Sequence, residues 1–515
     1  MLPATPQSEA ALKIIRTLRD AGHQAYLAGG CVRDLLLGRA PADYDVATSA
    51  TPGIVLDMFP RTFAVGAHFG VVLVAPEGED ARFVTEVATF RSDGVYSDGR
   101  HPDRVCYTIS PEEDVKRRDF TINGLLLDPV IAGCPAFTAD SSQEFAAGCP
   151  RSLALGDRGK PEPQPSGSAS GHDFSRAANV PSKNQGALAP VAGLLDYVGG
   201  VADLQAGIIR AIGRPEQRFE EDHLRMLRAV RFAARFGFEL DAETMRAIRS
   251  LATRINAVSR ERVRDELTRM LTEGHARRAF ELLDEASLLN EVLPEIARMK
   301  GVAQPPQYHP EGDVWTHTLM LLEQLEPGCS MTLAWGALLH DVGKPPTFRI
   351  APDRIRFDGH VEVGVAMGAE ICRRFRFSNE ETRQILALIE NHMRFADADR
   401  MKASTLKRFF RLNNFDEHLA LHRMDCMAAS RNLDHYDFVR DRWKAMPEET
   451  VRPKPLITGR ELIAAGYAPG EGFREMLRAA EDAQLEGLVS TEEEALKFVA
   501  QKFGPPGGPR VRDGI

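Results

Sequence analysis

The sequence predicts an α+β protein, with a small head of mixed sheet and helices followed by a long all-α region. Short runs of apolar and β-branched residues, which are typical of strands, fall at 25–28, 69–74 and 82–91. From Ile208 onward the apolar residues recur at helical spacing instead. A length of 515 residues allows two to four domains, and a segment without apolar periodicity, 131–193, separates the two patterns.

Composition limits the class of protein. Hydrophobic residues make up 43% and charged residues 27% of the chain, which is ordinary for a soluble globular protein. No apolar run has the length of a membrane span and the start lacks a signal-peptide pattern, so we expect no membrane partner. The seven cysteines are scattered and never spaced C-x-x-C, which favours a reducing, cytoplasmic location over a cysteine-bound zinc. Because the net charge is −9, any nucleic-acid partner needs a local basic surface.

The elements of the head follow from local signals. In chain order we expect a helix, a strand, a helix, a strand and a helix at 8–22, 25–28, 32–37, 43–47 and 51–59. Gly38 ends the second helix, and Pro52 suits the first turn of the third.

A glycine turn and two carboxylates stand out in this region. Gly29 and Gly30 follow the first strand, and glycine lets the backbone approach a phosphate closely. Arg33 adds a guanidinium that can pair with phosphate oxygens. Asp43 and Asp45 are two residues apart, which on a strand places both carboxylates on one face, where they repel unless a cation lies between them. Taken separately, the pieces fit equally an ordinary turn and a solvated acidic loop.

In this order and at this spacing, the motif resembles the DNA polymerase β-like nucleotidyltransferases, and more narrowly the tRNA nucleotidyltransferase (CCA-adding enzyme) and bacterial poly(A) polymerase family. The resemblance implies that Asp43 and Asp45 are catalytic and bind Mg²⁺ together with the phosphates of a nucleotide. The resemblance also implies that Glu86 is the third carboxylate of this metal site. Without the resemblance, Glu86 would be interpreted as a solvent-facing residue of a strand. Residues 92–104 correspond to a flexible lid in the family, or to a plain surface loop.

A second motif follows at Arg118, where an arginine pair precedes an expected helix start. Asp119 and Asn123 are four residues apart and so share one face of that helix. The pattern matches the family's second motif, which implies that Arg118, Asp119 and Asn123 bind the nucleotide.

The segment 131–193 is dominated by Ala, Gly, Ser and Pro, and we expect a disordered insertion there because it cannot bury enough apolar surface to fold. The family pattern resumes after it, so the expected head comprises 1–130 and 194–215.

Residues 216–300 form the expected helical neck and body, and arginines gather there and just before it as a candidate RNA-binding surface. A helix over 220–235 places Asp222, Arg225 and Arg228 on one polar stripe, which could equally be a solvated, ion-paired face. A hydrogen-bond acceptor beside a donor matches the base edge that cytosine and adenine share. In the family such a helix selects the base, which implies that Asp222 and Arg225 read CTP and ATP. Arg228 and Arg231 would then bind the triphosphate or shape the pocket.

Residues 301–435 contain histidines and aspartates at the ends of apolar helical runs, a set that suits a divalent transition metal. This set resembles the HD phosphohydrolase superfamily, and the matching residues are His317, His340, Asp341, His360, His392 and Asp425. The other interpretation is a helical scaffold that has lost its metal. The tail, 436–515, is used against the tRNA body in the family, or serves as a structural cap.

The resemblance implies template-independent addition of CCA, or of the terminal A, to tRNA from CTP and ATP. Two alternatives stay open at this point. One is a bacterial poly(A) polymerase, which the acidic chain without a basic extension fits less well. The other is an HD phosphohydrolase whose N-terminal half only binds RNA. The paired carboxylates near Gly29 disfavour this alternative, because they suggest a catalytic head.

Overall fold

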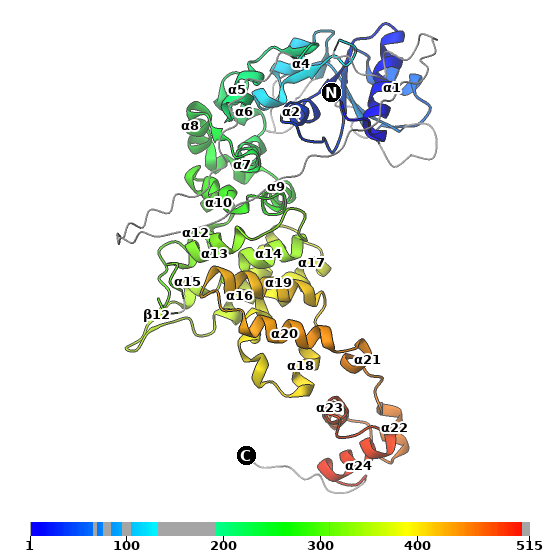
Figure 1. Ribbon diagram of the computed structural model, residues 1–515, viewed down its shortest axis with the longest axis vertical. Helices are drawn as coiled ribbons and strands as arrows, with labels where there is room; N and C mark the ends of the chain where they lie inside the picture. Colours follow the sequence, from blue (N-terminus) through cyan, green and yellow to red (C-terminus); the bar gives the residue numbers. More distant parts are fainter. Residues whose placement is uncertain are drawn as a thin grey trace, which may run out of the picture. The chain divides into compact units, whose positions relative to one another are not determined.

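The computed structural model describes residues 2–64, 70–75, 84–94, 105–131, 191–307 and 309–506. Most of the expected lid and nearly all of the expected insertion therefore lie outside the described residues. The chain divides into two compact units, one ending at Gly213 and the other beginning at Arg214; Figure 1 labels their elements. Among the described residues, no helix combines the length and the apolar character needed to cross a bilayer.

The first unit is built on one seven-stranded sheet with the strand order β3-β4-β5-β2-β1-β8-β9. Its strands are β1 (Ala25–Ala28), β2 (Asp45–Thr48), β3 (Thr62–Phe63), β4 (Val71–Val74), β5 (Thr85–Thr89), β8 (Leu125–Leu127) and β9 (Leu194–Asp196). Only the central pair β2 and β5 runs parallel, and the other pairs are antiparallel. A separate hairpin joins β6 (Arg91–Asp93) to β7 (Val105–Tyr107), and a short strand, β10 (Ile208–Ile209), closes the unit. The expected mixed sheet is therefore confirmed.

The helices of this unit are α1 (Pro6–Asp20), α2 (Gly30–Leu36), α3 (Pro52–Met58), α4 (Pro111–Lys116) and α5 (Gly200–Ala206). Residues of α1 such as Ile15 and Leu18 pack with Val46 and Val87 in the main core on one face of the sheet. The opposite face carries a smaller apolar cluster that includes Ala47. Because side chains alternate along a strand, Asp45 lies on this second face. The strand begins at Asp45, so Asp43 precedes it rather than lying within it as expected.

The second unit is almost entirely helical, as expected. Its first helices are α6 (Pro215–Glu221), α7 (Leu224–Phe236), α8 (Ala242–Leu251), α9 (Arg260–Thr272), α10 (Ala276–Glu285), α11 (Leu289–Val292) and α12 (Pro294–Ala297), with β11 at Glu239–Leu240. The next are α13 (Val314–Leu322), α14 (Met331–Leu339), α15 (Lys344–Thr347), α16 (His360–Arg374), α17 (Asn379–Asn391), α18 (Ala403–Phe409) and α19 (Phe415–Ala428). A small hairpin of β12 (Arg349–Ile350) and β13 (Ile355–Arg356) precedes α16. The last are α20 (Asp434–Ala445), α21 (Glu448–Val451), α22 (Gly459–Ala464), α23 (Gly472–Leu485) and α24 (Glu492–Phe503).

Two separate cores occupy the end of this unit. Phe395, Phe409, Phe415 and Val439 belong to one core, which also includes Val451. The other core is made by α22, α23 and α24, with Leu462, Ala483 and Val499 buried in it. The change from one core to the next therefore falls after Val451, and the segment up to Thr458 connects them (orange in Figure 1).

Candidate functional site

Three carboxylates meet at the centre of the head sheet. The parallel register pairs Val46 with Val87, so the residues just before them, Asp45 and Glu86, lie side by side on one face. Burial of Asp45 and the charges of Glu86 and Asp43 together outweigh the opposing Arg118 and raise the pKa of Asp45 to about 6. Asp43 and Glu86 themselves are exposed. The negative charge of the Asp45 carboxylate is therefore not balanced by positive charge nearby. A bound divalent cation would supply that balance, so the three carboxylates fit a cation site.

The glycine turn lies beside an arginine. Gly29 has a φ of 68°, which favours glycine, and a Cβ there would lie 3.1 Å from Nη1 of Arg118. Its N–H donates to the Leu125 carbonyl, so Gly29 contributes close approach rather than a hydrogen-bond donor. Arg118 is held by the buried Asp114, with 2.9 Å between Nη2 and Oδ2. Burial opposes the charge of Asp114, but Arg118 and Arg117 outweigh it and lower its pKa. We had not singled out Asp114, which stands four residues before Arg118 and so at helical contact distance.

Arg33 lies inside the head rather than at its surface. Its guanidinium donates to Oδ1 of Asn123 at 2.6 Å and to Oδ1 of Asp34 at 2.9 Å. Asn123 in turn donates to Asp119 at 3.0 Å. These contacts bring Arg33, Asp119 and Asn123 into one network. The expected helix is wrong, because α4 ends at Lys116 and only a 3₁₀ turn covers Thr121–Asn123. Asp119 bonds the N–H of Phe120, a local contact that competes with helix formation.

The expected continuous helix over 220–235 is also wrong. It breaks between α6 and α7, where Asp222 has an extended backbone and its Oδ1 accepts from the N–H of Leu224. Oδ2 of Asp222 pairs with Arg262 of α9 at 2.8 Å. Arg225 instead pairs with Glu221 at 2.6 Å. Asp222 and Arg225 are therefore not two positions on one helical stripe, and each has its own ionic partner.

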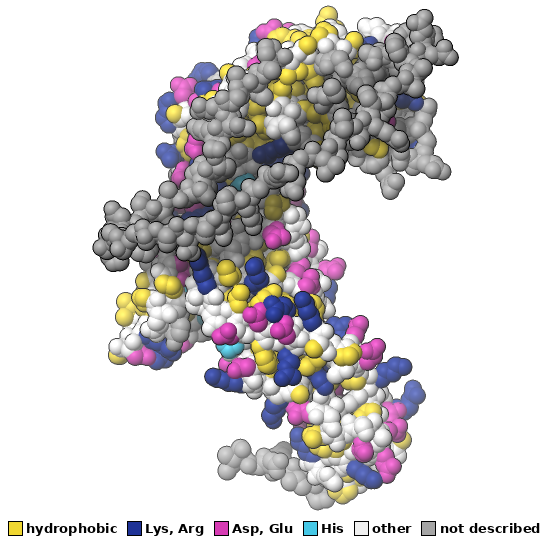
Figure 2. Space-filling model, in the orientation of Figure 1, with side chains coloured by type: hydrophobic (Ala, Val, Ile, Leu, Met, Phe, Trp, Pro, Cys, Tyr) yellow, Lys and Arg dark blue, Asp and Glu magenta, His cyan; other side chains and the backbone are white. Residues whose placement is uncertain are grey.

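Most arginines expected to form the basic surface are paired with carboxylates. Arg231 is buried and contacts Glu266 at 2.7 Å and Glu273 at 3.2 Å. Arg228 lies 3.8 Å from Glu266, and Arg235 lies 3.3 Å from Glu273. On the face of the second unit seen in Figure 2, blue and magenta side chains are interspersed. The region is therefore less positive than its arginine content suggests.

The predicted histidines and aspartates of the second unit come together at one place. Nε2 of His317 lies 3.0 Å from Oδ1 of Asp425 and 3.8 Å from Oδ2 of Asp341. Asp341 also lies 3.1 Å from Nε2 of His340, 4.0 Å from that of His360 and 3.8 Å from that of His392. All six predicted residues thus form one cluster, which lies on the wall of a cavity of about 700 Å³ whose lining includes Asp341, His360, His392 and Asp425.

Each histidine of this cluster is oriented through its other ring nitrogen. Nδ1 faces the carbonyl of Ala337 in His340, of Phe357 in His360 and of Ile389 in His392, at 2.7 to 2.9 Å. Within the described part of the chain, Nε2 of His340, His360 and His392 and Oδ1 of Asp341 are buried without a hydrogen bond, whereas Oδ2 of Asp341 lies 2.7 Å from Nζ of Lys344. Metal-binding histidines characteristically have Nδ1 fixed in this way while Nε2 binds the ion. The cluster therefore fits a divalent metal.

The charges of the cluster support the same conclusion. Burial opposes the charged form of His317, but the Asp425 and Glu311 carboxylates outweigh it and raise its pKa to about 9. Burial also disfavours the charge of Asp341, yet His340 and Lys344 hold its pKa well below the usual range. Burial lowers the pKa of His392 to about 4. The carboxylates therefore favour a positive charge at His317, where a bound metal ion would replace the proton on Nε2, while His392 stays neutral. Glu311 and Lys344 are not among the predicted site residues, although Lys344 stands three residues after Asp341.

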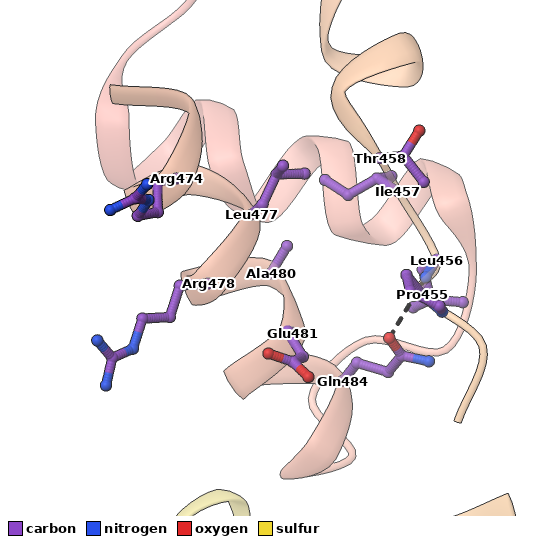
Figure 3. A pocket seen from close by; sticks show the side chains of 10 residues that line it. All are labelled: Pro455, Leu456, Ile457, Thr458, Arg474, Leu477, Arg478, Ala480, Glu481 and Gln484. Carbon is purple, nitrogen blue, oxygen red and sulfur yellow. Dashed lines mark hydrogen bonds between the residues drawn. The ribbon is translucent and has the colours of Figure 1, made fainter. Parts of the chain in front are cut away.

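A second cavity of about 440 Å³ lies in the tail between the segment 455–458 and α23 (Figure 3). Leu477 and Ile457 face each other across it, and Gln484 bonds the N–H of Leu456 at one end. Arg474 and Arg478 stand on the same side of α23. Among the described residues neither arginine has an ionic partner.

Three family models match separate parts of the chain. Residues 25–134 match the poly A polymerase head domain, 237–300 match the RNA- and SrmB-binding site of polymerase A, and 361–500 match tRNA nucleotidyltransferase domain 2. The chain is 33% identical to a CCA-adding enzyme of Lactobacillus helveticus over 61% of this chain and 63% of that enzyme. It is 35% identical to a CCA-adding enzyme of Geobacillus stearothermophilus over 57% of this chain and 56% of that enzyme. The matched part therefore spans less than two thirds of these curated relatives.

Solved structures extend the likeness over the whole chain. The structure is similar to that of the Bacillus stearothermophilus CCA-adding enzyme in complex with CTP, with a TM-score of 0.64, 25% identity and coverage of 96% of this chain and 98% of that one. The Thermotoga maritima CCA-adding enzyme shares the fold, with a TM-score of 0.52, 16% identity and coverage of 95% and 93%. The head, the RNA-binding region and the C-terminal region thus match separate models of poly(A) polymerases and tRNA nucleotidyltransferases, and the whole fold is similar to that of CCA-adding enzymes.

Proposed function

We propose that this chain is a template-independent tRNA nucleotidyltransferase that adds CCA, or the terminal A, to tRNA 3′ ends from CTP and ATP with release of pyrophosphate. The observation that carries the proposal is the group of three carboxylates on parallel β2 and β5, in a chain that resembles a CCA-adding enzyme over nearly its whole length. A poly(A) polymerase is less favoured, since the curated relatives compared above are CCA-adding enzymes.

In this proposal Asp43, Asp45 and Glu86 hold Mg²⁺, and Arg118 beside Gly29 binds the triphosphate. Bound Mg²⁺ neutralises phosphate charge and favours ionisation of the attacking hydroxyl. The protein then contributes mainly by positioning the reactants. Arg33 acts indirectly, because its bonds to Asn123 and Asp34 brace the turn that follows Gly29.

The test uses one tRNA that lacks its 3′ CCA and a second that lacks only the terminal A. Each is incubated with labelled CTP and ATP, separately and together. A CCA-adding enzyme extends both, an A-adding enzyme extends only the second, and a poly(A) polymerase lengthens either one without a defined stop. Incorporation by wild type but not by Asp45→Asn supports the proposal, and no incorporation by wild type contradicts it.

We further propose that Asp222 and Arg225 select the base. In this arrangement Arg262 and Glu221 hold the carboxylate and the guanidinium in place, rather than one shared helix. Side-chain readout of a base edge is worth roughly 1–3 kcal/mol, which is about ten- to a hundredfold in discrimination. Asp222→Ala should therefore raise UTP and GTP incorporation relative to CTP and ATP by about that factor, whereas the exposed Glu243→Ala should not.

A second activity is proposed for the histidine–aspartate cluster, namely binding of a divalent transition metal and hydrolysis of a phosphoester. Four inward-facing Nε2 atoms and the buried Asp341 support it. Metal analysis of the purified chain and of His340→Ala is the test. If the two preparations hold equal metal, or none, the cluster is only a scaffold.

We also infer that tRNA contacts the tail, where Arg474 and Arg478 flank the cavity of Figure 3. Their exposed guanidiniums suit phosphate oxygens.

We also propose a cytoplasmic location, which is consistent with the five described cysteines, all of them free.

A further inference from the structure

One carboxylate oxygen joins two histidines at the edge of the metal-binding cluster. Oε1 of Glu311 lies 2.7 Å from Nδ1 of His317 and 2.9 Å from Nδ1 of His309. The two rings meet edge to face, with their centroids 5.0 Å apart. Glu311 is 3% exposed, so this arrangement is buried. Neither His309 nor Glu311 belongs to the six residues assigned to the cluster above.

The loop that presents Glu311 is itself fixed. Gly312 has a φ of 125°, which favours glycine, and Asp313 caps α13 by accepting the N–H of Thr316 at 2.8 Å. Asp313 also accepts the N–H of Gly301 at 2.6 Å. The turn therefore returns Glu311 onto His317, six residues further along, on the first turns of α13.

These three residues could be read as a cation site of their own, because their ligand atoms lie close together. Distances argue otherwise. Two ligands at about 2.0–2.1 Å from a tetrahedral ion lie roughly 3.3 Å apart. The observed 2.7 and 2.9 Å are hydrogen-bond distances instead. An ionised carboxylate only accepts, so both Nδ1 atoms carry a proton, and Nε2 is the atom of each ring that remains for another partner.

His317 and His309 lie in different surroundings. Nε2 of His317 faces Asp341 and Asp425 within the cluster. His309 lines the cavity together with His360 and His392. A neutral ring that presents an acceptor suits a hydroxyl group and not an anionic phosphate oxygen.

We propose that Glu311 is a positioning residue for both halves of the hydrolytic site, holding His317 toward the metal and His309 toward a ribose hydroxyl of a ribonucleotide phosphoester. This inference rests on the proposed hydrolase function of the cluster. It makes one carboxylate responsible for both metal affinity and recognition of the sugar, although Glu311 itself contacts neither.

The experiment measures two quantities on the full-length protein. The first is the dissociation constant of Co²⁺ or Mn²⁺ from competition with a chelator. The second is KM and kcat for a ribonucleoside 2′- or 3′-phosphate and for p-nitrophenyl phosphate, which has no ribose. Nucleotide addition by the same preparations and their thermal midpoints report that the chain is folded.

Glu311→Gln should weaken metal binding about 10- to 100-fold, the usual effect of losing the partner of a metal-bound histidine. It should also raise KM for the ribonucleotide. His309→Ala should raise only that KM, by about three- to tenfold for one hydrogen bond, and leave metal affinity and p-nitrophenyl phosphate hydrolysis unchanged. His309→Gln, whose amide oxygen still accepts, should recover part of the loss. The matched control is Glu323→Gln, an exposed glutamate at the end of α13.

The outcomes separate the inference from the function on which it rests. Loss of metal in His309→Ala would make His309 a ligand and overturn the assignment. Unchanged metal affinity in Glu311→Gln would reduce Glu311 to a structural contact. A wild-type protein that binds no metal would overturn the hydrolase proposal together with this inference, whereas the nucleotide addition proposal would stand.

Discussion

The two groups of acidic and metal-binding residues in this chain are built in opposite ways. In the head, Asp43 and Glu86 are exposed, and burial together with these two negative charges outweighs Arg118 and raises the pKa of Asp45. In the second unit, His317, His340 and Asp341 are buried, and each of the four histidines of the cluster has its Nδ1 fixed by a carbonyl or by Glu311.

The difference teaches what each site needs from its ligand. The head carboxylates stand at the start of two strands, so the sheet fixes their spacing but supplies no counter-charge, and a metal–nucleotide complex fits such a site. The histidine–aspartate cluster is assembled before any ligand arrives, as suits a resident metal.

The largest effect should come from comparing two single substitutions, one in each site, by the same two measurements. Asp45→Asn removes one charge from the head and should lower nucleotide incorporation about a thousandfold or more, because several kcal/mol of metal-dependent stabilisation is lost. Bound transition metal should be unchanged. His340→Ala should do the reverse, abolishing metal retention while incorporation stays within about twofold. If either substitution affected both readouts strongly, the two sites would not be independent.

A glycine pair tests how tightly the cluster is packed. A Cβ at Gly343 would lie 2.0 Å from the His360 carbonyl oxygen, whereas one at Gly470 would meet nothing within 4 Å. Gly343→Ala should therefore destabilise the second unit by about 3 kcal/mol or more and displace His360, with loss of metal. Gly470→Ala should be close to neutral. Urea unfolding followed by tryptophan fluorescence measures this, since all three tryptophans, Trp315, Trp335 and Trp443, lie in the second unit. Equal midpoints for both variants would contradict the close packing.

Much of both sites could be predicted because their residues are close in sequence. Asp43 and Asp45 are two residues apart, and both lie near Glu86 in the structure although only Asp45 belongs to the strand. His340 and Asp341 are adjacent, and the end of α14 delivers both to the cluster. Gly29 was identifiable because a strand that ends in two glycines implies a special backbone geometry.

What could not be predicted depends on partners far apart in sequence. Arg33 was expected at a phosphate, but Asn123, ninety residues away, accepts its hydrogen bond in the interior. Arg262 and Glu266 come from α9, and no pattern near Asp222 or Arg231 indicates that they pair with them. The break at Asp222 was missed because the residues around it keep a helical polar and apolar spacing, whereas its side chain accepts the N–H of Leu224, a local bond that interrupts the helix.

His418 provides a buried histidine that belongs to neither site. It lies on α19, stacks against Phe415 at 6.4 Å, and within the described residues neither ring nitrogen has a hydrogen-bond partner. Burial and then the charge of Arg394 lower its pKa to about 4. A folded pKa below the unfolded value means that the unfolded chain binds more protons between pH 4 and 6.5. Stability should therefore be complete above pH 6.5 and fall as the pH drops toward 4.

This group should account for about 3 kcal/mol of that loss, from 1.36 kcal/mol per pKa unit. His418→Leu should remove the corresponding part of the pH dependence, so that urea unfolding by tryptophan fluorescence shows a flatter profile from pH 6.5 to 4. The contrast with the cluster is sharp, since His317 is also buried but has a raised pKa because two carboxylates face it. An unchanged slope in His418→Leu would show that other groups carry the acid response.

The smallest effect concerns charges that remain in water. The tail has its own core, and it meets α18 through polar contacts. Arg408 pairs with Glu481 and Asp482, and Arg411 lies 2.5 Å from Glu481. Lys407 adds a hydrogen bond to the Leu485 carbonyl at 2.6 Å. The arginine and acidic side chains of this contact are about a quarter to two fifths exposed, so solvent screens them.

Exposed ion pairs of this kind contribute about 0.2–1 kcal/mol each and weaken with salt. Replacing both Arg408 and Arg411 by alanine should therefore speed amide hydrogen exchange at the end of α23 by only about two- to fivefold at 50 mM salt, and by less at 0.5 M. Arg440→Ala, which removes a pair confined to α20, should change nothing there. Exchange is followed by mass spectrometry of the peptides that cover Glu481 to Glu486. An effect that is large and insensitive to salt would mean that these charges are shielded from water in solution, and the tail would then be joined to the body as firmly as the buried cluster is held together.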